Sequence, residues 1–229
     1  MTVVLYDLCG TGDRRFSPYC WRTRMALAHK GLEVDVRPTR FTEIASICDG
    51  ERRTLPTLED RGRTLTDSWE IACYLEETYP DRPALFGDAV STGTTYFIQS
   101  WANTVLHPGL IGLVLHDIWE NLSEPDRDYF RESREKRFGR TLETVQEGRE
   151  ERVVAFRAAL APLRTTLSTQ PFVAGKAPAY ADYVVFGAFQ WVRVMSPFRV
   201  LADDDPIRAW FQRCLDLHGG VARDVPTFY

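Results

Sequence analysis

A serine followed by a proline stands between an apolar strand and a helix, and its hydroxyl is well placed for chemistry. Val3-Val4-Leu5-Tyr6 is typical of a short buried strand, and helical spacing of apolar residues begins at Pro18. Ser17 therefore falls at the N-cap and Pro18 at the first helical position. Because a helix N-terminus carries unpaired N–H groups and partial positive charge, we expect an anion site here.

Two later motifs belong to the same stretch of chain. Leu55-Pro56-Thr57 precedes a short hairpin, and Asp67-Ser68 opens another helix. Taken one at a time, Ser17 and Asp67-Ser68 would each be ordinary helix caps worth about 1 kcal/mol. Their order and spacing together are what favour a binding site.

The cysteines and histidines favour neither a disulfide framework nor a metal site. The cysteines are odd in number, scattered, and without a Cys-x-x-Cys pair, so we expect free thiols in a reducing cytoplasm. None of the histidines is spaced as a ligand pair on a helix, so we predict no bound metal. The residues concerned are Cys9, Cys20, Cys48, Cys73, Cys214, His29, His107, His116 and His218.

Charge and hydropathy exclude two classes of partner. The 229 residues include 28 basic and 32 acidic side chains, a net charge of −4, which gives no footprint for nucleic acid. No apolar run approaches the ~20 residues of a membrane helix, and the start lacks the pattern of a signal peptide. We therefore expect a cytoplasmic protein that binds neither nucleic acid nor membrane.

The first third of the chain alternates strands and helices. The pattern predicts a helix over 18–30, a strand over 33–37, a hairpin over 57–66 that turns at Asp60-Arg61-Gly62-Arg63, and a helix over 68–79. With the first strand, this order implies a four-stranded mixed sheet.

Pro80-Asp81-Arg82-Pro83 is the predicted boundary, which divides the chain into domains 1–82 and 90–229. Beyond it the pattern predicts only helices, and Pro162 should kink or divide the longest of them. The mixed charges from Arg131 to Arg152 favour a solvated helix face. The predicted helices cover 92–116, 124–138, 141–168, 180–195 and 206–217.

The series of strand, Ser-Pro-x-Cys helix, Leu-Pro before a hairpin, and Asp-Ser cap resembles the cytosolic glutathione transferases. That resemblance covers nearly the whole chain. It implies an α/β thioredoxin-like domain that binds glutathione, followed by an all-α domain that binds the second substrate, in a homodimer. It also implies a cis bond before Pro56, with Leu55 offering its backbone to the cysteinyl unit of glutathione.

The resemblance assigns further roles around the peptide. Ser68 and its amide would hold the γ-glutamyl carboxylate, and Asp67 the ammonium group. Arg40 or Arg53 would meet the glycyl carboxylate. Ser17 would stabilise the thiolate without itself attacking; lowering a thiol pKa by two units takes about 2.7 kcal/mol. Tyr19, Trp101 and Trp191 are candidates for the wall of a pocket for an aromatic substrate.

Several segments are more specifically similar to the bacterial β-etherases and the etherase-like fungal class. They are 17–31, Asp67-Ser-Trp-Glu-Ile, 79–86, and the stretch from Ser133 to Glu150. β-Etherases use the glutathione thiolate to displace a phenolate from the carbon beside a ketone. The chain departs from the transferase pattern at Ala179, where Ser or Thr usually completes a capping box with Asp182, so we expect Asp182 to serve that helix start alone.

Three other functions remain open on this fold. Cys20 occupies the last position of what would be a thioredoxin Cys-x-x-Cys, which would suit a glutathione-dependent thiol oxidoreductase; its place one turn into the helix favours a buried, inert thiol. A maleylacetoacetate isomerase is disfavoured because Pro18 and Tyr19 stand where that class has Ser and Cys. A non-catalytic glutathione-binding or ligand-binding protein is the third alternative.

Overall fold

A four-stranded mixed sheet forms the first half of the chain. The computed structural model describes residues 2–47 and 54–229. The strand order is β2-β1-β3-β4, with β1 parallel to β2 and antiparallel to β3, as the βαβ-then-ββα pattern predicts. The elements of this half are β1 (Val3–Leu8), α1 (Pro18–His29), β2 (Val34–Thr39), β3 (Thr57–Asp60), β4 (Arg63–Leu65) and α2 (Ser68–Thr78).

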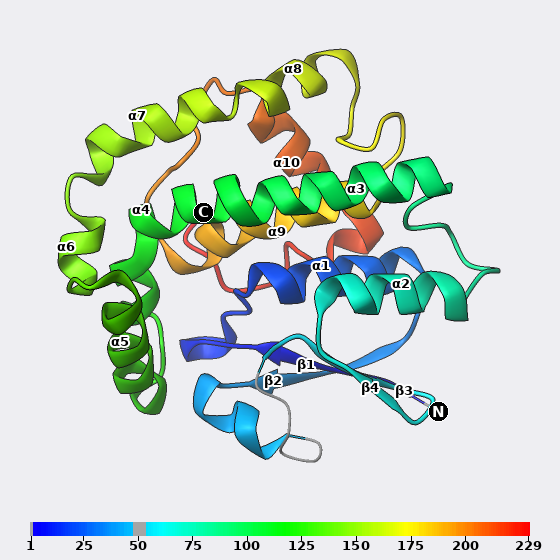
Figure 1. Ribbon diagram of the computed structural model, residues 1–229, viewed down its shortest axis with the longest axis horizontal. Helices are drawn as coiled ribbons and strands as arrows, with labels where there is room; N and C mark the ends of the chain where they lie inside the picture. The colour runs from blue at the N-terminus through cyan, green and yellow to red at the C-terminus, as the bar shows by residue number, and fades with distance from the viewer. Residues whose placement is uncertain (1, 48–53) are drawn as a thin grey trace.

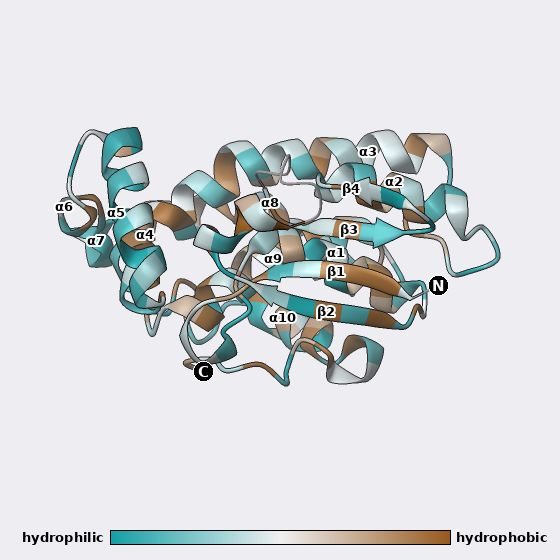
Figure 2. Cartoon of the chain, turned by 90° about the horizontal axis from the view of Figure 1, so that it is seen from below, coloured by the Kyte–Doolittle hydropathy of each residue, from teal (hydrophilic) through white to brown (hydrophobic). Residues whose placement is uncertain are grey.

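The central strand owes its place to alternating burial. Leu5 is fully buried and pairs with Val36 on one side and Leu58 on the other. Side chains two apart share one face of a strand, so Val3 and Leu5 point into the same core. Helices α1 and α2 lie together on that side of the sheet (Figure 1). Seen from below, the sheet lies in front of the helices (Figure 2).

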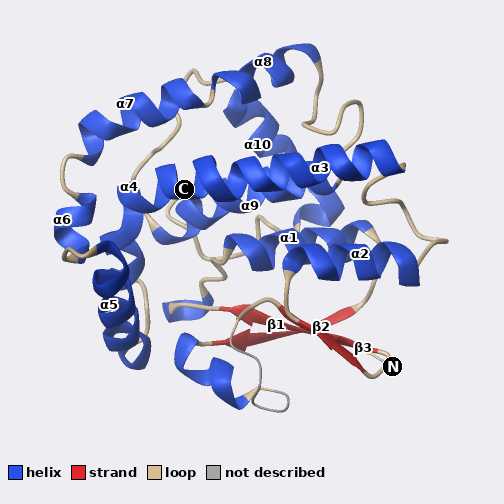
Figure 3. Ribbon diagram, viewed as in Figure 1, coloured by secondary structure: helices blue, strands red, loops and turns tan. Residues whose placement is uncertain are grey.

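Helices make up the second half, and no strand follows β4 in the part of the chain that the structure describes (Figure 3). A π-helical turn, Ala102–Leu106, joins α3 to α4, so the predicted helix 92–116 is longer than expected and continues to Glu120. The helices are α3 (Ala89–Trp101), α4 (His107–Glu120), α5 (Glu124–Phe138), α6 (Leu142–Gln146), α7 (Arg149–Ala159), α8 (Ala161–Thr169), α9 (Tyr180–Met195) and α10 (Ile207–Leu215).

The segment 141–168 is divided near Pro162, as predicted, but a further break that was not predicted makes it three helices. Gly148, in the left-handed conformation at φ 68°, separates α6 from α7. A second break at Leu160 precedes α8, whose first turn contains Pro162, the residue predicted to divide the helix. The ranges predicted for α5 and α9, 124–138 and 180–195, are confirmed.

Helix α9 is the link between the two halves. All of its residues are buried, and it packs along α1. Asp182 near its start accepts hydrogen bonds from the N–H groups of Ala179, Val173 and Ala174 and from the Trp210 indole. Asp182 caps the helix start without a partner side chain at Ala179, as expected, and its carboxylate also holds the preceding loop and α10.

Two further expectations concern membrane-spanning helices and the domain boundary. Over residues 2–47 and 54–229, none of the helices combines the length and hydropathy that crossing a bilayer requires. The division into domains at 1–82 and 90–229 stays a prediction.

Candidate active site

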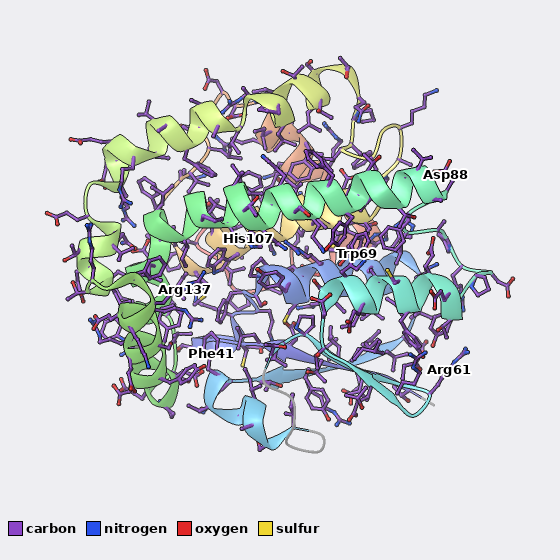
Figure 4. All side chains as sticks on the ribbon, in the orientation of Figure 1. Phe41, Arg61, Trp69, Asp88, His107 and Arg137 are labelled. Atoms are coloured by element: carbon purple, nitrogen blue, oxygen red, sulfur yellow. The ribbon has the colours of Figure 1, made fainter. Side chains whose placement is uncertain are left out.

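A cleft of about 760 Å³ lies between the sheet half and the helical half. In Figure 4, His107 on the helical side, Phe41 after β2 and Arg137 of α5 are three of the residues around it. The cleft brings together most of the predicted site residues: Ser17, Tyr19, Leu55, Pro56, Asp67, Ser68 and Trp191.

Ser17 is the N-cap of α1, as the sequence predicts. Its Oγ accepts a hydrogen bond from the N–H of Cys20 at 3.3 Å, and the residue is 4% exposed. That bond uses an oxygen lone pair, so the hydroxyl hydrogen can be donated either to the Cys20 sulfur, which this hydroxyl contacts, or to a ligand in the cleft that Ser17 lines. A hydroxyl donor and the positive end of α1 therefore act at the same point, which suits an anion.

Cys20 is fully buried under Ser17. Burial, and then the carboxyl of Asp7, raise the pKa of its thiol well above the ordinary value. Since the thiolate is the reactive form, this thiol is protonated and inert at neutral pH. The expectation of a buried Cys20 is confirmed, which counts against a thiol oxidoreductase built on this residue.

The Leu55–Pro56 peptide bond is cis, as the resemblance implies. Leu55 is half-buried beside the cleft, and Pro56 is buried. Neither the N–H nor the C=O of Leu55 hydrogen-bonds to another described residue. Among the described residues nothing competes for these two groups, which suits pairing with the backbone of a peptide ligand.

Asp67 and Ser68 form the start of α2 at the edge of the cleft. One carboxylate oxygen of Asp67 accepts from the N–H groups of Trp69 and Glu70, at 2.8 and 3.0 Å. Its second oxygen accepts no hydrogen bond from the part of the chain that the structure describes, and it can accept from an ammonium group. The Ser68 carbonyl accepts from the Tyr180 hydroxyl at 2.6 Å, which fixes this helix start against α9. The pair can thus hold both charges of an amino-acid head.

Two predicted residues are not brought to the cleft. Arg40 is exposed and lines a separate depression with Cys9 and Glu43. Trp101 is half-buried and packs against the core. Arg53 lies outside the described residues.

Helix α5 supplies cleft residues that sequence reasoning missed. Phe130, Arg134 and Phe138 recur at helical spacing and line the cleft together with the exposed Arg137. The Arg134 guanidinium lies 4.8 Å from the centre of the Phe130 ring, and burial lowers its pKa. The prediction of a wholly solvated face is therefore wrong at Arg134, although Phe130 and Phe138, eight residues apart on one helix face, were a usable signal.

The chain has a thioredoxin-like half and an all-helical half, and the cleft between them contains a helix-capping serine. This combination is typical of proteins that bind a thiol-containing peptide. Family models agree: residues 16–78 match "Glutathione S-transferase, N-terminal domain", and residues 94–217 match "Glutathione S-transferase, C-terminal domain". The chain belongs to the glutathione S-transferase family, and its co-substrate is glutathione.

Individual relatives span most of the chain. The glutathione S-transferase-like protein ustS of Aspergillus flavus is 29% identical and aligns with 82% of this chain and 78% of its own. Glutathione transferase GSTFuA3 of Phanerochaete chrysosporium has a TM-score of 0.83 at 24% identity, covering 93% of this chain and 96% of its own. CsGST63524 of Ceriporiopsis subvermispora, solved in complex with glutathione, has a TM-score of 0.79 at 26% identity, with 95% and 96% covered.

Proposed function

We propose that this transferase binds glutathione with its sulfur at Ser17 and uses the thiolate to cleave β-aryl ethers beside a ketone. The observation that carries the first half is the convergence of Ser17, the open backbone of Leu55 and the Asp67-Ser68 helix start on one cleft. The second half rests on the etherase-like segments and on the aromatic lining of the same cleft.

The tripeptide fits this cleft in one direction. The γ-glutamyl ammonium pairs with the second oxygen of Asp67, and its carboxylate with the hydroxyl and N–H of Ser68. The cysteinyl unit pairs with the backbone of Leu55, a contact that tolerates any side chain there. Arg40 and Arg53 stay predictions for the glycyl carboxylate.

Ser17 makes the bound sulfur reactive. A free thiol of pKa ~8.5 is only about 3% ionised at pH 7. Lowering the pKa by two units requires about 2.7 kcal/mol of differential stabilisation, which a hydroxyl donor and a helix N-terminus can supply together. The serine oxygen forms no covalent bond.

The second substrate occupies the aromatic part of the cleft. Tyr19 and Trp191 on one side and Phe41 and Phe130 on the other offer apolar faces for two phenyl rings. Sulfur bonds to the β carbon while the carbon–oxygen bond breaks, and the electron pair leaves with the phenolate, which takes a proton from water. The adjacent carbonyl activates that carbon, so the protein's main task is to ionise and position the thiol.

Phenol release tests this proposal. Each enantiomer of an α-keto β-aryl ether, incubated with enzyme and glutathione, should give a phenol and a thioether of inverted configuration on chromatography. The matched α-alcohol should react far more slowly, because it lacks carbonyl activation. Conjugation of a simple aryl halide with no phenol from either enantiomer would leave a general transferase and contradict the etherase proposal.

We also propose a homodimer. Val90 and Phe97 of α3 are 77% and 69% exposed, and Tyr96 beside them is exposed as well. Large apolar side chains grouped on one helix favour an interface with a second copy, and sedimentation velocity of the purified chain tests it. A cytoplasmic location stays a prediction.

A further inference from the structure

We infer that the Tyr19 hydroxyl is a hydrogen-bond donor to the ketone oxygen of the second substrate, held in that role by His107 and Arg22. The inference deepens the proposed function and rests on it for the ketone. It depends on three side chains in series: Arg22 contacts His107, and His107 contacts Tyr19, which lines the cleft.

Arg22 is the first residue of this series, and hydrogen bonds hold its side chain in place. Its residue is 1% exposed, and its Nη2 donates to Asn103 Oδ1 at 2.9 Å and approaches His107 Nε2 at 3.3 Å. Its Nη1 donates to Gln99 Oε1 at 3.4 Å. A guanidinium has only donors, so every partner of Arg22 must accept.

His107 therefore exists in one tautomer. Its Nε2 has to present a lone pair to Arg22, and the ring cannot also be protonated there. Burial, with Arg22 as the second cause, lowers the pKa of His107 to about 3, so the imidazole is neutral at pH 7. The single ring proton then sits on Nδ1, which lies 3.3 Å from the Tyr19 hydroxyl oxygen and donates to it.

The Tyr19 hydroxyl is available as a hydrogen-bond donor. Its oxygen accepts from His107, and its hydroxyl has no acceptor among the described residues. The Tyr19 ring is held edge-on to His107 and under the Arg22 guanidinium, 4.7 Å from the ring centre. The side chain is 38% exposed and lines the cleft, so the free O–H faces the ligand space.

The position relative to Ser17 gives this donor a use. Ser17 is the N-cap of α1 and Tyr19 lies in its first turn, so both hydroxyls come from one helix end and line one cleft. A sulfur held at Ser17 and a carbonyl oxygen held at Tyr19 would flank the carbon under attack. A donor on that oxygen withdraws electron density from the neighbouring carbon and favours displacement.

A matched pair of electrophiles separates this inference from the etherase proposal. Phenacyl chloride carries a ketone beside the reacting carbon, and benzyl chloride carries none; in both, sulfur bonds to carbon and chloride leaves with the electron pair. We expect Tyr19→Phe to lower kcat/KM for phenacyl chloride about a hundredfold, the lower end of what loss of one oxyanion donor costs, and for benzyl chloride by less than about threefold. Tyr6→Phe, in β1 and outside the cleft lining, is the control.

Equal losses of kcat/KM on the two chlorides, or none on the ketone, would overturn the inference. Because both compounds are simple electrophiles, this result is obtained even if no aryl ether is cleaved. Aryl ethers with phenols of increasing pKa add a second check where they react: a Tyr19→Phe loss that does not change with the leaving group supports the ketone oxygen. A loss that grows with phenol pKa would assign Tyr19 to the leaving oxygen and refute our assignment.

His107 is a positioning residue in this scheme. His107→Asn keeps an N–H near the place of Nδ1 and should retain most of the preference for phenacyl over benzyl chloride. His107→Leu removes the donor and should lose that preference, while activity on benzyl chloride reports whether the protein remains folded. Retention of the preference in a folded His107→Leu would overturn the role of His107.

Discussion

At the residue scale, the Ser17 hydroxyl accepts one hydrogen bond from the N–H of Cys20 and can donate its hydrogen to a bound sulfur. Replacing it by alanine removes the donor to sulfur but leaves the helix N-terminus. We expect Ser17→Ala to raise the pKa of the bound glutathione thiol by a unit or more, about 1.4 kcal/mol, with little change in glutathione affinity. Ultraviolet titration of the thiolate in the complex measures that pKa.

Ser123→Ala is the matched control, because Ser123 is also a helix N-cap but lies outside the cleft. It should leave the thiol pKa unchanged. An unchanged pKa in Ser17→Ala itself would transfer the whole stabilisation to the helix N-terminus.

Single residues differ in how far the sequence could place them. Ser17 and Asp67 act through helix caps, which are local signals that a sequence carries openly. Arg134 reaches the cleft only because of the rotation of α5 about its axis, and a charged residue on a polar helix looks the same whichever way it faces. Trp101 and Trp191 were both predicted to line the cleft, but only Trp191 does. Two tryptophans in predicted helices look alike in sequence, so their type did not tell which one faces the cleft.

At the element scale, α1 is positioned by its contact with α9. Gly187 of α9 lies under the start of α1, where a Cβ would come within 2.4 Å of the Pro18 carbonyl oxygen. Only a glycine allows the two backbones this approach. The alignment of the Ser17 hydroxyl with the cleft therefore depends on a residue in the other half of the chain.

Gly187→Ala should destabilise the protein although alanine favours helix by about 1 kcal/mol. The clash is with backbone, so α1 and α9 must separate, and overpacking of this kind costs about 1–3 kcal/mol. We expect a lower urea midpoint and reduced transferase activity. Gly93→Ala, inside α3 with no atom within 4 Å of the added Cβ, is the control and should raise the midpoint. A Gly187→Ala protein as stable as Gly93→Ala would contradict the close-approach argument.

Elements with strong periodicity were predictable, and interruptions of helices were not. The strands and α5 follow from local pattern, because burial alternates with the period of each element. The break at Gly148 requires a left-handed glycine that looks in sequence like any helix glycine. The π-helical turn before Pro108 similarly accommodates the missing N–H of that proline. Helix propensities do not predict such a local change of hydrogen bonding.

At the scale of the whole molecule, a partly buried group of three side chains connects distant parts of the chain. The Tyr183 hydroxyl of α9 lies 2.5 Å from His29 Nδ1, at the end of α1, and 2.9 Å from His218 Nε2, near the C-terminus. His29 and Tyr183 are 154 positions apart in sequence, and Tyr183 and His218 are a further 35 positions apart. Such a meeting depends on topology, so sequence pattern alone could not predict it.

This group should make stability depend on pH. Burial, followed by the charge of His29, lowers the pKa of His218 to about 4, and burial also lowers the pKa of His29, whose charged neighbours are Lys30 and Glu76. Unfolded histidine titrates near pH ~6.5. Between about pH 6.5 and pH 4 the unfolded chain therefore binds more protons than the folded one, so stability is full above this window and is lost as pH falls through it.

We expect the free energy of unfolding, measured by urea titration at intervals from pH 7.5 to 4.5, to fall with decreasing pH. His218→Gln removes one of the titrating groups, so the proton uptake on unfolding near pH 5 should decrease by about one. The variant should lose stability at pH 7.5 as well, because Tyr183 loses a partner, but its curve should be flatter than that of the native chain. Parallel curves for the two proteins would mean that the His29–Tyr183–His218 group does not couple protonation to the packing of the two halves against each other.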